Sequence, residues 1–320
     1  MNILTVSPSP HRRSPMTTQK IMLCVIISLM PALVMSGVIF GLRALMLISV
    51  CISGSILFEG VCRIIMKREQ TISDLSAAVT GILLAFNLPV TLPLWMALVG
   101  CFVAIVIVKQ LFGGLGQNFA NPAIVARIVL MVSFTADMTK WAVPQYWNEG
   151  GSEIVTGATP LVTNDASWMD LLTGFTGGCL GETCAIALIA GGLFLIVMRI
   201  ISPVTPIAFI GTAAVLSFIW GISNGDMSFA LEHTGYQVLS GGLLLGAFFM
   251  ATDYVTTPIT AKGKLIFGIG CGLITFLIRQ FGSYPEGVSF SILLMNIVTP
   301  YIDRFTMKKP VGGLKEEKAK

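Results

Sequence analysis

The chain has 320 residues, of which 54% are hydrophobic and only 11% are charged. Soluble domains carry about 25% charged residues, so this composition excludes an ordinary soluble protein. The net charge of +4 gives no indication of a nucleic-acid partner. Apolar runs long enough to cross a bilayer recur along the whole chain. We therefore predict an all-α fold, a polytopic membrane helix bundle.

The apolar runs predict about ten transmembrane helices, separated by short polar or glycine-rich segments. In chain order we expect them at residues 20–40, 43–65, 72–88, 93–111, 122–134, 183–201, 204–222, 237–252, 264–281 and 287–305. The first run could pass for a signal peptide, but its length and the many spans after it favour a retained helix. We divide the single membrane domain into a first repeat at 1–135, a polar loop at 136–182, a second repeat at 183–305 and a tail at 306–320.

The basic residues are distributed unevenly over the predicted loops. An even number of spans puts both termini on one side of the membrane. That side then holds Arg12, Arg13, Lys20, Arg63, Lys67, Arg68, Lys109, Arg199, Lys262, Lys264, Arg304, Lys308, Lys309, Lys315, Lys318 and Lys320, against Arg43, Lys140 and Arg279 on the other. Basic loops stay in the cytoplasm, so we expect cytoplasmic termini in a bacterial inner membrane and the 136–182 loop on the outer face.

Short sequence matches recur in the two halves in the same order. Gly100-Cys101 recurs as Gly270-Cys271, Lys109-Gln110 as Arg279-Gln280, and Leu75-Ser76 as Leu239-Ser240. This order predicts two five-helix repeats, which are inverted because five is an odd number. A duplicated scaffold without a shared transport pathway is the alternative.

The cysteines and histidines indicate no metal site and no catalytic triad. The seven cysteines include no Cys-x-x-Cys motif, and five of them lie in apolar runs. Cys179 and Cys184 flank a predicted membrane boundary, far in sequence from His11 and His233. We interpret the cysteines as small hydrophobic residues, with a disulfide or metal role for Cys179 and Cys184 as the alternative.

The longest polar interval contains the sequence Thr156-Gly157-Ala158-Thr159-Pro160-Leu161. Gly157 gives the backbone freedom, and Ala158 leaves room beside a flat partner. Pro160 biases Thr159 toward an extended conformation that projects its hydroxyl. The residue types alone are also compatible with an ordinary polar turn.

This motif resembles the Ser/Thr-Gly-Ala-Thr flavinylation signature. The signature occurs in RnfD, a membrane component of the Rnf complex (an ion-translocating ferredoxin:NAD⁺ oxidoreductase), and in NqrB, its counterpart in the Na⁺-translocating NADH:quinone reductase. Further family-like stretches occur in the same order at 109–114, 116–123, 181–183, 251–255 and 284–287. RnfD is the closer match in length, and Gln110 stands where NqrB carries glutamate.

The resemblance implies a subunit of a redox-driven pump for Na⁺ or H⁺, active only within its complex. It implies FMN joined to Thr159 through a phosphoester, made by a separate flavin transferase, with Thr156, Gly157 and Ala158 around it. A second flavin, for which riboflavin is the candidate, is expected near the inner half of the bundle. The implied partners are a second covalent-FMN subunit, iron–sulfur subunits, small membrane subunits and lipid.

Several polar residues near the predicted membrane boundaries are candidates for contacts with these cofactors. Arg127 could neutralise a flavin phosphate or a carboxylate, or extend to the inner surface. Asn118 and Asn121 could bind a ring edge or cap the following helix, and Asp253 could contact an ion or cofactor. Gly113 and Gly114 belong to the same glycine-rich turn. A passive inverted-repeat transporter and a structural membrane anchor are the rival functions, and covalent flavin separates the redox-driven pump from both.

Overall fold

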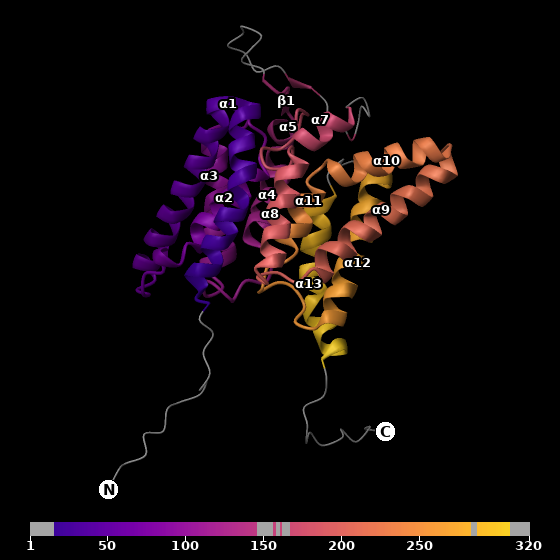
Figure 1. Ribbon diagram of the computed structural model, residues 1–320. Coiled ribbons are helices and arrows are strands. Elements are labelled where there is room, and N and C mark those ends of the chain that lie inside the picture. The colour runs from indigo at the N-terminus through magenta and orange to yellow at the C-terminus, as the bar shows by residue number, and fades with distance from the viewer. Residues whose placement is uncertain (1–15, 146–155, 158–160, 162–166, 283–286, 308–320) are drawn as a thin grey trace, which may run out of the picture.

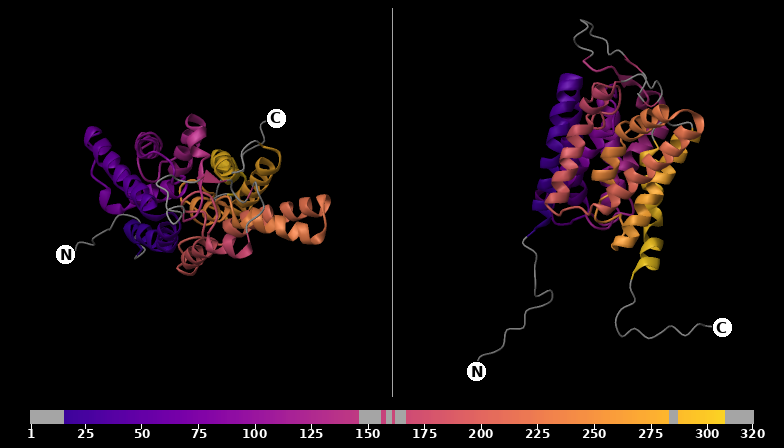
Figure 2. Two further views of the ribbon diagram at one scale, coloured as in Figure 1. Left: turned by 90° about the horizontal axis from the view of Figure 1, so that it is seen from above. Right: turned by 45° about the vertical axis from the view of Figure 1, so that its right-hand side comes forward.

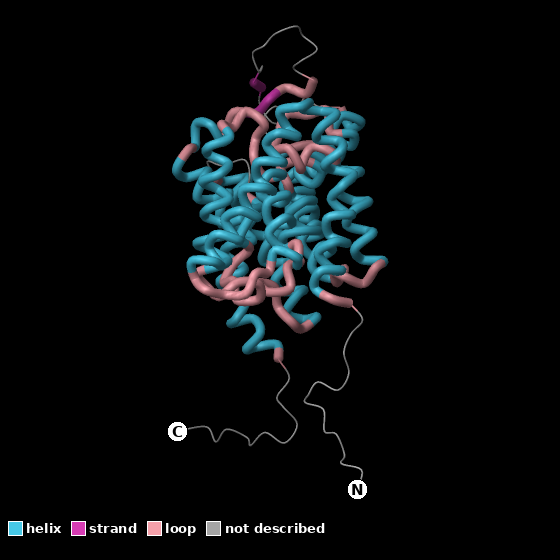
Figure 3. Tube along the Cα trace, turned by 90° about the vertical axis from the view of Figure 1, so that its left-hand side faces the viewer, coloured by secondary structure: helices cyan, strands magenta, loops and turns pink. Residues whose placement is uncertain are grey.

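The computed structural model describes residues 16–145, 156–157, 161, 167–282 and 287–307. These residues form a bundle of helices that run mostly along one direction (Figure 1). The start of the first helix and the end of the last one lie at the same end of the bundle, and the short strands lie at the opposite end (Figures 1 and 3). This arrangement agrees with an even number of membrane crossings.

The first two predicted helices form one element, α1 (Thr18–Ile65), which is interrupted at Gly41. Gly41 has φ 70° and ψ −158°, a conformation that is open to glycine and closed to most other residues. The predicted division between 40 and 43 is therefore in the right place. A short 3₁₀ turn, η1 (Ile72–Asp74), connects α1 to α2 (Ser76–Phe86).

Helix α2 is shorter than the prediction of a full span over 72–88. Its 11 residues extend about 16 Å, roughly half the thickness of the apolar core of a bilayer. The prediction was too long because Leu75, with φ 63°, separates the 3₁₀ turn from the helix. At the other end, the segment Asn87-Leu88-Pro89 stops it.

The predicted helix at 93–111 changes its geometry half-way. It begins as α3 (Leu94–Phe102) and continues as a π-helical segment, η2 (Val103–Gln110). A glycine-rich loop then leads to α4 (Pro122–Ser133), followed by the short α5 (Thr135–Met138). Pro122 occupies the first turn of α4, where its missing N–H has no cost.

The polar interval has some regular structure. Two short antiparallel strands, β1 (Trp141–Ala142) and β2 (Thr156–Gly157), pair with each other. Helix α7 (Trp168–Thr173) follows, and α8 (Ala185–Val197) begins the second half of the bundle.

The prediction of one span at 237–252 was wrong. The structure has α10 (Met227–Leu239), a break, and then α11 (Leu243–Leu245), which continues as the π-helical segment η4 (Gly246–Met250). Gly241 and Gly242 have φ of 69° and 70°, and two successive left-handed residues end a right-handed helix. The apolar runs did not reveal α10, because it is only moderately apolar and buries only Ala230.

Three long helices complete the bundle. They are α9 (Val204–Asn224), α12 (Ala261–Phe281) and α13 (Val288–Thr306). Seen along the helix axes, the bundle is elongated and the pair α9 and α10 projects at one edge (Figure 2). Among the described residues, α1, α9 and α12 are long and apolar enough to cross a membrane by themselves. Their composition supports a membrane location.

The C-terminal ends of two short helical segments, α2 and α11–η4, meet inside the bundle. Asn87, which caps α2, donates from Nδ2 to Met250 Sδ over 3.6 Å. Asn121 at the start of α4 donates to the Met250 carbonyl over 3.3 Å. Each segment follows a left-handed residue, Leu75 or Gly242, and the matched residues Lys109 and Arg279 both end the helices that follow. The Lys109 and Arg279 match therefore falls at equivalent places in the fold, whereas Leu75-Ser76 begins α2 and Leu239-Ser240 ends α10.

Candidate functional site

A cavity of about 110 Å³ lies between the two halves of the bundle. A single water needs about 10–15 Å³, so this space admits a considerably larger ligand. Its apolar wall includes Val79, Leu83, Phe248 and Phe249, and its polar residues come from separate elements. A mostly apolar cavity with a few converging polar groups is typical of a cofactor site.

Three of the predicted site residues meet in this cavity. Asn118 and Asn121 lie on the loop before α4, and Asp253 lies on the loop after η4. Desolvation in this wall raises the pKa of the Asp253 carboxyl above its ordinary value. Residues that are far apart in the sequence therefore line one cavity.

The two asparagines have different roles in the structure. Asn121 caps α4, because its Oδ1 accepts from the Ala123 N–H over 3.1 Å and the Ile124 N–H over 3.5 Å. The Oδ1 of Asn118 is buried and has no hydrogen-bond partner within the described part of the chain. A buried acceptor without a partner is costly, so this oxygen is suited to a donor on a ligand.

Both π-helical segments contribute to the cavity wall. Lys109 comes from η2, and Phe248 and Phe249 come from η4. Single π-helical turns occur frequently at functional sites because they redirect side chains that an α-helix would point elsewhere. Here the two segments bring Lys109 and two aromatic residues to the wall of the same cavity.

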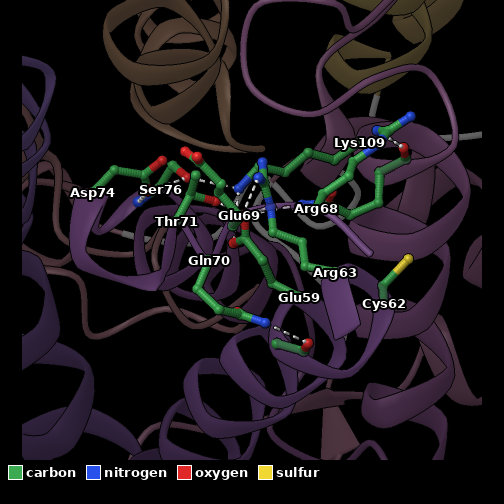
Figure 4. Close-up of polar contacts among 12 residues, drawn as sticks. Glu59, Cys62, Arg63, Arg68, Glu69, Gln70, Thr71, Asp74, Ser76 and Lys109 are labelled. Atoms are coloured by element: carbon green, nitrogen blue, oxygen red, sulfur yellow. Dashed lines mark hydrogen bonds and ion pairs between the residues drawn. The ribbon is translucent and has the colours of Figure 1, made fainter. Parts of the chain in front are cut away.

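Lys109 belongs to a buried charged cluster beside the cavity (Figure 4). Its Nζ lies 3.0 Å from Glu59 Oε2 and donates to Ser76 Oγ over 2.6 Å. Glu59 Oε1 also accepts from Gln110 Nε2 over 2.9 Å and from Thr71 Oγ1 over 3.1 Å. Glu59 is 0% exposed and Lys109 is 1% exposed. These contacts fix α1, α2 and η2 against one another.

Sequence patterns did not reveal this cluster. Lys109 and Arg63 were interpreted as loop cations that report topology, whereas both are buried. Glu59 was overlooked, although a carboxylate inside the apolar run 43–65 is itself a signal of function. The predicted cofactor residues Gly113 and Gly114 lie near this cluster and outside the cavity wall. A Cβ added to Gly114 would lie 2.8 Å from Arg63 Nη2.

Arg127 points into the bundle and does not extend to the inner surface. It is 2% exposed. Its guanidinium donates to Asn87 Oδ1 over 2.6 Å and to Cys179 Sγ over 3.4 Å. The carboxylate of Glu182 attracts it electrostatically. Arg127 therefore holds the connector before α8 against the end of α2, and its burial does not fit the predicted alternative of extending to the inner surface.

The flavinylation motif begins at the end of the bundle opposite the termini. Thr156 and Gly157 form strand β2, paired with Ala142 and Trp141, while Ala158 and Thr159 lie outside the described residues. On the far side of the motif, Leu161 packs against Gly241, since a Cβ there would collide with Leu161 and with Arg279. The residues flanking Thr159 are thus held by β1 on one side and by the α10–α11 turn on the other.

Residues 5–312 match the model of the NQR2, RnfD, RnfE family. The chain belongs to this family. It is 47% identical to the D-type subunit of the Na⁺-translocating ferredoxin:NAD⁺ oxidoreductase complex of Acetobacterium woodii, over 98% of this chain and 97% of that protein. It is 42% identical, over 97% of both chains, to the D-type subunit of the proton-translocating ferredoxin:NAD⁺ oxidoreductase complex of Clostridium ljungdahlii. The D-type subunit of an ion-translocating oxidoreductase complex of Stutzerimonas stutzeri is 35% identical over 92% of both chains. The resemblance noted in the motifs is therefore confirmed at the level of the family.

Proposed function

We propose that this chain is the RnfD membrane subunit of a redox-driven ion pump that moves electrons between ferredoxin and NAD⁺. The supporting observation is the similarity over nearly the whole chain to the corresponding subunits of such complexes. The names of these relatives differ in the ion, Na⁺ or H⁺, so the proposal covers both. As a subunit, the chain acts only with its partners, among which we propose a second covalent-FMN subunit and iron–sulfur subunits.

We further propose that Thr159 carries FMN through a phosphoester, on the outer side of the bacterial inner membrane, with both termini in the cytoplasm. Support comes from the Thr156-Gly157-Ala158-Thr159 sequence and from the position of β2 at the end opposite the termini (Figure 1). The isoalloxazine supplies the redox chemistry, and the chain supplies position and surroundings. Thr159 would be an anchor that prevents loss of the cofactor to the outside.

The cavity is our proposed site for a second, non-covalent flavin. The residues present fit such a group: Asn118 Oδ1 offers an acceptor to a ring N–H, Lys109 offers a cation, and Phe248 and Phe249 offer apolar contact. Asn121 and Asp253 complete the polar edge.

The first test of this function is flavin analysis of the wild-type chain within its complex, produced in a host with the flavin transferase. We expect the denatured chain to fluoresce in a gel and to exceed its apo mass by one FMN phosphoester. We also expect acid extraction to release a further, non-covalent flavin. A dark chain at apo mass would reject the electron-carrier function and favour the passive transporter.

Asn118→Ala tests the assignment of the cavity. One lost hydrogen bond of about 1 kcal/mol weakens binding roughly fivefold, so we expect less extractable flavin after dialysis and unchanged covalent flavin on Thr159. Asn224→Ala is the matched control, because Asn224 is exposed and bonds only to the Trp220 carbonyl. Equal flavin retention in the two variants would contradict the assignment.

A further inference from the structure

A chain of hydrogen bonds leads from the cavity to the end of the molecule that carries the termini (Figures 1 and 4). Lys109 Nζ donates to Ser76 Oγ over 2.6 Å, and Ser76 Oγ donates to Asp74 Oδ1 over 2.6 Å. Lys109 and Ser76 both line the cavity. Lys109 is almost fully buried, whereas Asp74, on the turn before α2, is half-buried. The buried ammonium is thus linked to the molecular surface by one intervening hydroxyl.

The charges around Lys109 allow it to lose a proton. Its carboxylate partner Glu59 has a second cation nearby, since Arg63 Nε lies 3.8 Å from Glu59 Oε1. This Arg63 nitrogen has no hydrogen-bond partner among the described residues. Gln110 and Thr71 also donate to Glu59 Oε1. A neutral Lys109 would therefore leave Glu59 with hydrogen bonds and a balancing charge.

In the second half of the bundle, Arg279 occupies the position that matches Lys109, and its interactions differ from those of Lys109. Arg279 Nη2 donates to the carbonyls of Ser240 and Gly241 over 3.2 and 2.8 Å, so it fixes the turn before α11. Arginine stays protonated in proteins, whereas buried lysine changes its protonation state readily. Of the two matched residues, the one that lines the cavity is Lys109, which is able to exchange a proton.

We propose that Lys109 donates a proton to the flavin bound in the cavity and is reprotonated from the surface through Ser76 and Asp74. This inference rests on the proposed function, because it requires a flavin in that cavity. In the step, the Lys109 Nζ–H bond breaks and a flavin ring N–H bond forms, while ferredoxin supplies the electrons in the proposed reaction. Asp74 then takes a proton from solvent. It passes this proton to Ser76 Oγ while the Ser76 hydroxyl, turned toward the neutral amine, gives its own proton to Lys109 Nζ, so Ser76 stays a hydroxyl and Asp74 ends as the carboxylate.

Charged groups face Lys109 from several of the elements that surround it. They are Glu59 and Arg63 on α1, Arg68 on the loop between α1 and η1, Asp74 on η1, and Asp253 in the cavity wall. Of these, only Lys109 and Asp253 line the cavity. Asp253 belongs to no hydrogen bond of the Lys109 chain that the structure describes, so the chain through Ser76 to Asp74 leads from Lys109 alone.

The experiment compares Lys109→Arg with the wild-type complex after the extractable flavin has been measured. Arginine keeps the positive charge but cannot release a proton at neutral pH. We therefore expect a flavin content and a midpoint potential near those of the wild type. The rate of reduction of the non-covalent flavin by dithionite, followed by stopped-flow absorbance, should fall at least tenfold, because general acid catalysis contributes typically about 10²–10⁴-fold. Imidazolium should restore part of the rate, and Lys140→Arg, at an exposed ion pair, should change none of these quantities.

If Lys109→Arg loses its flavin, a second variant, Asp74→Asn, still tests the relay. Asp74 does not line the cavity, and asparagine keeps an oxygen acceptor for the Ser76 N–H. We expect a normal first reduction, for which Lys109 is already protonated, and a slower second one after reoxidation. Unchanged rates in both variants with flavin retained would overturn the relay and leave the proposed function standing. Absence of extractable flavin from the wild type would overturn the relay together with the proposed second-flavin site, and would leave the proposal of covalent FMN on Thr159 standing.

Discussion

We expect the Thr159→Ala chain to insert into the membrane and to carry no covalent flavin. The phosphoester needs a hydroxyl on residue 159, and alanine has none. Insertion depends on the long apolar helices, such as α1, α9 and α12, whose sequences the substitution leaves unchanged. In-gel fluorescence of the denatured chain should disappear completely, and the intact mass should fall to that of the apo chain.

Two matched variants make this result specific to one hydroxyl. Thr163→Ala removes the next threonine along the loop and should leave fluorescence unchanged. Thr159→Ser keeps a hydroxyl and should retain part of the covalent flavin. Fluorescence that persists on the denatured Thr159→Ala chain would show that the flavin is attached elsewhere.

The second large effect is expected at Glu59. Glu59→Leu should destabilise the chain by about 3–5 kcal/mol, the usual cost of removing one partner of a buried ion pair. Leucine would leave the Lys109 ammonium with only Ser76 as its described partner, and the Gln110 amide would lose its acceptor as well. Reversible unfolding by SDS in mixed micelles measures this free energy.

An exposed ion pair of the same length serves as the control. Lys140 Nζ lies 2.9 Å from Asp137 Oδ1, but the two side chains are 56% and 33% exposed. Asp137→Asn should therefore cost less than about 1 kcal/mol. If both substitutions had the same small effect, the Glu59 cluster would not hold α1 and η2 together, and Glu59 would be free to serve another purpose.

The sequence alone was sufficient to predict the membrane class, most helices and the family. Apolar runs of membrane length are a local signal, because every backbone polar group in lipid must be satisfied within its own helix. The flavinylation motif is equally local, since Thr156 to Thr159 are neighbours in the chain. The predicted division between 40 and 43 agrees with the structure, in which the glycine conformation of Gly41 interrupts α1.

Tertiary structure decided where helices stop short and which polar groups meet. No local sequence pattern shows that α2 and η4 end against each other at Asn87 and Met250, because each end is stabilised by residues from the other half of the bundle. The sequence equally could not show that Lys109 is buried against Glu59, fifty positions earlier. A charged side chain near a helix end is usually exposed to water. Lys109 is shielded from water only because η2 packs against α1 and α2, and this burial makes its ion-pair partner Glu59 essential. Local patterns thus determined the membrane helices and the family motifs, and long-range packing determined the cavity and the charged cluster beside it.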